Sequence, residues 1–193
     1  RQVPLSVTRL KVSDNYLKRY LQASKMKKAY LTILLIISIQ LSFSQSVDFD
    51  LIKYNGLNFH CSKTEILEKF GQPTKTYDPN YECGFLSTDS LDSEYLTLDY
   101  GKIKFTGNEK ELFVLEQVQL ENDTSIFIKY GNENLTCNTD LSKLIEIFGD
   151  GLSKHFGNKI DGAIVIFQKD ADDGIRLTLK NGKLVHFEYW SPC

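Results

Sequence analysis

The sequence has little proline, methionine or tryptophan and lacks any long apolar run. Its 193 residues include four Pro, one Met, one Trp and 12 Gly. With so little Pro and Gly and 41% hydrophobic residues, the composition excludes a collagen-like repeat and a long disordered chain. No apolar stretch approaches the ~20 residues of a membrane-spanning helix, which excludes a protein with several membrane spans. The composition therefore predicts a folded domain.

The common active-site motifs are missing as well. The sequence contains no G-x-S-x-G, no H-E-x-x-H and no Gly-rich phosphate loop between a strand and a helix. The acidic run at residues 170–174 has the wrong spacing for a calcium loop and is typical of a solvated turn. We therefore expect no catalytic residues, no metal site and no cofactor.

Charge is distributed unevenly along the chain, although the net charge is only -2. Residues 1–44 contain eight basic residues and one acidic residue, for a charge of +7, whereas residues 45–193 contain 15 basic and 24 acidic residues, for -9. Nucleic-acid binding needs a basic stripe. The acidic balance of residues 45–193 therefore argues against a nucleic-acid partner.

Residues 26–44 have the three parts of a secretory signal peptide. Two lysines follow Met26, residues 29–39 form a short apolar run, and small residues then predict a cut between Ser44 and Gln45. We expect an exported protein, periplasmic or secreted, with no stable membrane anchor after cleavage. Residues 1–25 precede this signal and are interpreted as an over-extended gene start, or else as a basic extension.

The cysteines agree with export. Cys61, Cys83, Cys137 and Cys193 all follow the predicted cut, and no two of them form a C-x-x-C motif. An even number of cysteines in an exported domain favours two disulfides, whereas a zinc knuckle would need closer spacing. Three pairings are possible, and the sequence does not select one.

Internal similarity predicts a tandem duplication. Ile52-Lys53-Tyr54 recurs as Ile128-Lys129-Tyr130, residues 65–71 resemble residues 143–149, and residues 96–103 resemble residues 177–184. The order of these matches is conserved, as expected for repeats with small loop insertions. The predicted units are residues 45–131 and 132–193, within one mature domain of residues 45–193.

Each unit begins with a short helix. Ser62 and Glu65 have the spacing of a capping box, and Asn138 or Thr139 can cap the second helix. Gly71 and Gly149 follow the two apolar stripes, where a helix commonly ends.

Antiparallel strands follow each helix. Asn181-Gly182 is typical of a two-residue hairpin turn. Tyr100-Gly101 stands at the matching place in the first unit and predicts Asp99 opposite Lys102. The expected fold class is α+β, with two tandem repeats of a short helix, or a helical hairpin, plus an antiparallel β-sheet.

The repeated unit, with its helix-end motif Lys69-Phe70-Gly71-Gln72-Pro73, resembles the β-lactamase inhibitory proteins. It is also similar to the small outer-membrane assembly lipoproteins. The second copy reads Ile147-Phe148-Gly149-Asp150-Gly151, without the Pro, and no lipidation Cys is present. The resemblance implies a non-catalytic exported module that binds a protein partner through its sheet.

The sequence suggests one candidate partner-binding face. Alternation along the predicted strands places Tyr95, Arg176, Phe187 and Tyr189 together, opposite a row of leucines, unless the two C-terminal aromatics belong to the core. His186 is expected to point inward, unless a bulge brings Phe187 inward instead. We expect a binding module (an inhibitor, an immunity-type protein or an envelope factor). The alternatives are a small secreted hydrolase using His155 or His186, and a structural envelope subunit.

Overall fold

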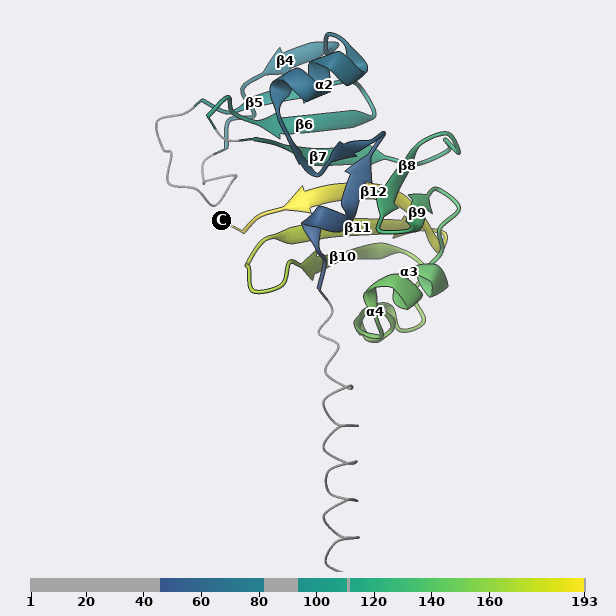
Figure 1. The fold of residues 1–193 in the computed structure, drawn as a ribbon. Helices are drawn as coiled ribbons and strands as arrows, with labels where there is room; N and C mark the ends of the chain where they lie inside the picture. The colour runs from purple at the N-terminus through teal and green to yellow at the C-terminus, as the bar shows by residue number, and fades with distance from the viewer. Residues whose placement is uncertain (1–45, 82–93, 111, 193) are drawn as a thin grey trace, which may run out of the picture. The chain divides into compact units, whose positions relative to one another are not determined.

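The structure, a computed structural model, describes residues 46–81, 94–110 and 112–192, which belong to one compact unit. It combines short helices with two antiparallel sheets (Figure 1), so the predicted α+β class is confirmed. The helices are η1 (Phe49–Leu51), α2 (Lys63–Phe70), α3 (Leu141–Phe148) and α4 (Gly151–Phe156). Among the described helices, none is long and apolar enough to cross a membrane.

Most strands belong to an antiparallel sheet of eight. Its order is β10 (Gly162–Phe167), β11 (Gly174–Lys180), β12 (Lys183–Trp190), β7 (Phe113–Gln119), β6 (Ile103–Gly107), β5 (Leu96–Asp99) and β4 (Lys75–Tyr77). The eighth strand, β3 (His60–Cys61), also pairs with β7. The small sheet has the order β2 (Leu57–Asn58), β1 (Ile52–Tyr54), β8 (Phe127–Tyr130) and β9 (Glu133–Thr136).

The helix termini follow local sequence signals. Ser62 caps α2 through the predicted capping box, in which Ser62 N donates to Glu65 Oε2 at 2.7 Å and Glu65 N donates to Ser62 Oγ at 3.2 Å. The predicted cap of α3 was wrong, because Asp140 accepts the hydrogen bond from Lys143 N. Both helices end at a glycine with positive φ, 74° at Gly71 and 95° at Gly149.

The two predicted hairpin turns had different outcomes. Asn181-Gly182 joins β11 to β12 as expected, with positive φ at both residues. The turn between β5 and β6 lies one residue later than predicted, because Tyr100 N donates to Ile103 O and Asp99 pairs with Lys104 instead of Lys102. A shift of two residues in strand register leaves each side chain on its predicted face.

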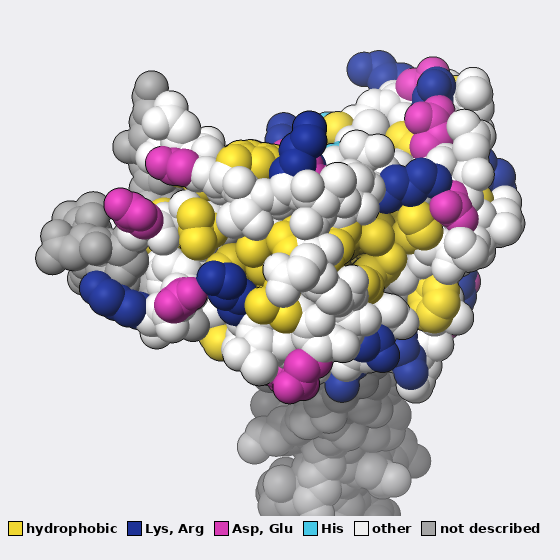
Figure 2. Space-filling view, turned by 90° about the horizontal axis from the view of Figure 1, so that it is seen from above, with side chains coloured by type: hydrophobic (Ala, Val, Ile, Leu, Met, Phe, Trp, Pro, Cys, Tyr) yellow, Lys and Arg dark blue, Asp and Glu magenta, His cyan; other side chains and the backbone are white. Residues whose placement is uncertain are grey.

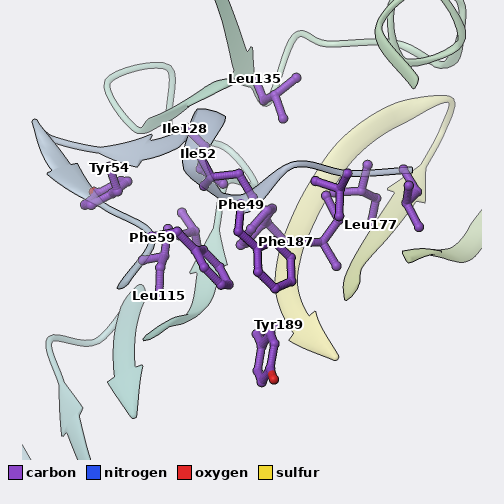
Figure 3. Packing of buried hydrophobic residues seen from close by; sticks show 14 of the residues in the cluster. Phe49, Ile52, Tyr54, Phe59, Leu115, Ile128, Leu135, Leu177, Phe187 and Tyr189 are labelled. Carbon is purple, nitrogen blue, oxygen red and sulfur yellow. The ribbon is translucent and has the colours of Figure 1, made fainter. Parts of the chain in front are cut away.

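Aromatic side chains from distant segments form the centre of the core (Figure 3). The Phe49 and Phe59 ring centroids lie 4.4 Å apart, and the Tyr189 ring lies 6.0 Å and 5.8 Å from them. Phe187 joins this cluster with no exposed surface. The core therefore ties the first strands of the domain to its last strand.

A second aromatic group surrounds the end of α2. The Phe70 ring lies 5.4 Å from Tyr100, 5.7 Å from Phe105 and 5.9 Å from Tyr54. Phe70 and Tyr100 are only partly buried. Seen from above, the molecule has a band of hydrophobic side chains with charged side chains around it (Figure 2).

The tandem duplication stays a prediction. Each half contains a hairpin, a capped helix and an antiparallel meander, which has four strands in the first half (β4 to β7) and three in the second (β10 to β12). The last strands of the two meanders, β7 and β12, pair with each other. However, the sequence match between residues 96–103 and 177–184 aligns β5 with β11 and β6 with β12. In the sheet, counting strands outward from the β7–β12 pair makes β5 the counterpart of β10 instead. The predicted boundary at residue 131 also lies in the turn of the β8–β9 hairpin.

Candidate functional site

The predicted partner-binding face is wrong for Phe187 and Tyr189, whereas the alternative of a bulge that brings Phe187 inward is confirmed. Phe187 has no exposed surface, Tyr189 is 5% exposed, and Tyr95 packs partly buried against the core. Phe187 and Tyr189 are buried because the strand register shifts between Thr178 and Leu179. The extra residue opposite this step is Val185, and it turns the side chains that follow to the opposite face of β12. Arg176 stays on the face opposite the core, as predicted.

The same bulge places three side chains of β12 on the outer face of the large sheet, where two side chains of β10 and β11 join them. These side chains lie on three adjacent strands, where they alternate with side chains of the opposite face. We call them the open-face cluster: Phe167, Arg176, His186, Glu188 and Trp190. Arg176 pairs directly with Glu188 across β11 and β12. The guanidinium donates two hydrogen bonds to the carboxylate, from Nε at 3.0 Å and from Nη2 at 2.8 Å.

Two aromatic rings form one end of this cluster. The Phe167 and Trp190 rings meet edge to face with centroids 5.4 Å apart. Both residues are paired with Gly174 of β11, which has no side chain to separate the rings. Phe167 is 45% exposed, so a large aromatic surface faces solvent beside the ion pair.

The other half of this face carries a network of side-chain hydrogen bonds. Tyr81 Oη donates to Glu116 Oε1 at 2.7 Å, the Thr106 hydroxyl donates to Glu116 Oε2 at 2.5 Å, and the Thr97 and Thr106 hydroxyls lie 2.6 Å apart. Thr97 and Thr106 are buried. Burial and the bond to Glu116 raise the pKa of Tyr81, so its hydroxyl stays protonated and donates. The open-face cluster lies beside this network, on β10, β11 and β12.

Charge partners set the protonation state of Glu188. His186, whose Nε2 lies 3.7 Å from Oε2, and the two hydrogen bonds from Arg176 lower the pKa of Glu188 from 4.5 to about 2. Burial acts in the opposite direction but is outweighed. Glu188 is therefore ionised at neutral pH and holds the Arg176 side chain in place.

This shift predicts a dependence of stability on pH. A carboxylate whose pKa is lower in the folded state contributes stability above its unfolded value, and that contribution is lost as the pH falls. We expect Glu188→Gln to reduce the loss of unfolding free energy between about pH 4.5 and about pH 2. Urea unfolding at several pH values in this window tests this, with the exposed Glu68→Gln as control. Equal pH slopes for wild type and Glu188→Gln would contradict it.

The two histidines of the hydrolase alternative lie on different elements, and that alternative stays a prediction. His155 lies on α4, and its Nε2 is 3.0 Å from Ala163 O at the edge of β10. His186 neighbours Glu188 and pairs across the strands with Thr178. A carboxylate with a pKa near 2 is a poor proton acceptor at neutral pH, so Glu188 itself is not suited to act as a general base. No described group of three or more His, Cys, Asp or Glu could hold a metal ion.

The predicted disulfides stay a prediction, because two of the four cysteines lie outside the described residues. Cys61 and Cys137 are free thiols, whereas Cys83, Cys193 and the predicted Ser44–Gln45 cut lie outside the described residues. Cys61 is 2% exposed, and burial, followed by the charge of Glu65, raises its pKa to about 12. Such a thiol is protonated and shielded at neutral pH and is a weak nucleophile.

Thiol titration checks this state of the cysteines. We expect Cys61 to resist a thiol reagent in the native protein and to react once the protein is unfolded without reductant. Mass mapping of the modified peptides identifies each cysteine, and the half-buried Cys137 should react before Cys61. Failure of Cys61 and Cys137 to react after unfolding would show that they form disulfides.

Sequence reasoning missed four members of the open-face cluster. Phe167, His186, Glu188 and Trp190 alternate with buried residues, but regular alternation across the bulge assigns β12 to the wrong faces. A signal was present, because His186, Glu188 and Trp190 occupy alternate positions and therefore share one face. Regular alternation would also put the apolar Leu184 on that face, whereas a bulge moves it to the other. Comparison of the chain with protein-family models, with curated proteins and with solved structures finds no match.

Proposed function

We propose that the protein is a non-catalytic binding module that holds a protein partner against the open face of its large sheet. The observation that carries this proposal is the open-face cluster, in which an exposed aromatic pair adjoins an ordered Arg176–Glu188 ion pair. Trp and Arg are the residue types most enriched at interface positions that dominate affinity. The Arg176 side chain, 40% exposed, is already held in one conformation, so less side-chain entropy is lost on binding.

The proposal places this activity after export, in the periplasm or outside the cell. That part rests on the predicted signal peptide at residues 26–44 and on the acidic charge of residues 45–193. An inhibitor, an immunity-type protein and an envelope factor are all binding modules of this kind. The resemblance to the β-lactamase inhibitory proteins favours an inhibitor among these three and stays a hypothesis.

Quantitative capture tests the binding surface. The tagged protein is incubated with envelope and culture-medium fractions of its native source, and captured proteins are measured by mass spectrometry. We expect Phe167→Ala to reduce capture of the specific partner at least tenfold, equivalent to about 1.4 kcal/mol. The matched control is Leu112→Ala, because Leu112 is 43% exposed outside the cluster. Equal capture by wild type and both variants would reject the open face as the binding surface.

Fluorescence gives an independent measure with the purified partner. Trp190 is the single Trp of the chain and belongs to the cluster, so its emission reports on this surface alone. We expect the partner to shift or quench that emission to a saturating value. Saturable binding without any change at Trp190 would place the partner elsewhere.

A further inference from the structure

The two copies of the Ile-Lys-Tyr motif lie side by side in the small sheet. β1 and β8 are antiparallel neighbours, and their register pairs Ile52 with Tyr130, Lys53 with Lys129, and Tyr54 with Ile128. The isoleucines and Tyr54 are buried in the core, and Tyr130 packs against it. The lysines between them therefore point to the opposite face and directly neighbour each other.

Amide side chains continue this row on both sides. Asn58 of β2 pairs with Lys53, and Asn134 of β9 pairs with Lys129. All four side chains are exposed. The row, which we call the Asn–Lys–Lys–Asn row, thus crosses all four strands of the small sheet. Phe127, two residues before Lys129 on the same strand, is 42% exposed beside it.

The two ammonium groups have no acidic partner among the described residues. Other lysines form ion pairs with nearby carboxylates, as Lys102 does with Asp123 at 2.8 Å and Lys180 with Glu121 at 2.7 Å. Lys53 and Lys129 make no such contact, although residues 45–193 contain 24 acidic residues. Like charges directly opposite each other in an antiparallel pair repel. An acidic ligand across the row would remove this repulsion and gain two charge-assisted hydrogen bonds.

We propose that the Asn–Lys–Lys–Asn row is a second binding site, which takes a short acidic segment of a protein through its Asp or Glu carboxylates. The charge of the rest of the domain decides between this occupant and a larger polyanion. A membrane or a nucleic acid would bring an extended negative surface against a domain of charge -9, whereas a short segment meets only the two lysines. The asparagine amides can bond the backbone of such a segment, and Phe127 offers it an apolar contact. The site lies on a different sheet from the open-face cluster and is independent of it.

Titration with a defined acidic peptide tests this site. The probe is hexaglutamate, added at low salt to the isotope-labelled full chain and followed by NMR shifts of backbone amides and lysine side chains. We expect saturable shifts centred on β1 and β8. The residue-specific readout separates this site from the basic residues 1–44, which also attract the peptide. We expect the double variant Lys53→Gln/Lys129→Gln to weaken binding at β1 and β8 at least tenfold.

The matched control removes two lysines from another exposed region. Lys154→Gln/Lys159→Gln makes the same change in net charge and should leave the peptide affinity at β1 and β8 within twofold of wild type. A third variant, Lys129→Glu, replaces the repelling pair with an attractive one. It should lose peptide binding while its melting temperature stays equal or rises, which shows that lost binding does not reflect unfolding.

Three outcomes would overturn the proposal. Shifts that do not include β1 and β8 would place peptide binding elsewhere, and equal losses in the two double variants would indicate non-specific attraction. The third outcome uses vesicles in which one phospholipid in four is anionic. If these vesicles bind at the row more tightly than hexaglutamate does, the row is a site for a membrane surface instead. None of these outcomes affects the open-face cluster, whose test uses Trp190.

Discussion

Phe187→Ala should destabilise the protein by about 3–5 kcal/mol, the usual cost of deleting a buried aromatic side chain. Phe187 has no exposed surface and pairs with Leu177 on β11 and Val118 on β7. It therefore packs where the two meanders join, and the cavity would be lined by both halves. Because small domains have total stabilities of about 5–15 kcal/mol, this loss would be a large fraction of the whole.

Urea unfolding followed by circular dichroism measures this effect. The control is the adjacent His186→Ala, which changes the outer face of the same strand and should cost less than about 1 kcal/mol. The pair of variants also tests the bulge in β12. If His186→Ala were the more destabilising of the two, the side chains of β12 would be assigned to the wrong faces.

The fold class was predictable because it depends on local signals that agree with one another. The capping box at Ser62, the glycines that end α2 and α3 and the Asn181-Gly182 turn each involve residues close in sequence. Such signals fix where elements begin and end. Alternation of apolar residues then indicates that one face of each strand is buried.

The sequence left two alternatives for the faces of β12, with and without a bulge, and the choice between them depends on distant residues. Val185 O accepts hydrogen bonds from Leu120 N at 2.9 Å and from Glu121 N at 3.2 Å, beyond the end of β7. Nothing local to Val185 marks that position. One extra residue reverses every later side chain, so the prediction failed for Phe187 and Tyr189 together.

The cap of α3 failed for a similar reason. Thr139 has a good capping side chain, but its hydroxyl accepts a hydrogen bond from Thr136 N at 2.9 Å and is buried in that turn. The N-cap is therefore one residue later, at Asp140, and the helix begins at Leu141. Competition between local hydrogen bonds is decided by packing, which a single sequence does not display.

The candidate sites show the same division between local and distant information. The Ile-Lys-Tyr motif was visible as a repeat, yet only the pairing of β1 with β8 shows that its lysines meet. The open-face cluster likewise needs three strands in register before Phe167, Arg176 and Trp190 become neighbours. Strand pairing brings the residues of these two surface sites together. The sites can therefore be recognised from the sheet topology and not from a sequence motif.

Gly174→Ala should both destabilise the protein and disturb the open-face cluster. A Cβ built on Gly174 would lie 2.8 Å from Phe167 Cα and 2.9 Å from the Ile166 carbonyl carbon, closer than side chains approach a backbone. The φ of Gly174 is not positive, so the cost is steric and falls on β10. Strand β10 must move, and Phe167 moves with it. We expect a loss of about 1–3 kcal/mol or more, as for overpacked sites, and a changed Trp190 emission.

Gly107→Ala is the matched control for this prediction. A Cβ on Gly107 would lie 2.6 Å from Phe113 Cα, the same kind of clash between neighbouring strands, but in the half of the sheet without Trp190. Both variants should therefore lose stability to a similar degree, whereas Gly174→Ala alone should alter the native fluorescence spectrum and partner capture. Wild-type stability of Gly174→Ala would show that β10 yields without cost. An altered Trp190 emission in Gly107→Ala would show that the two halves of the sheet respond as one unit, because the pairing of β7 with β12 would then transmit the displacement to the cluster.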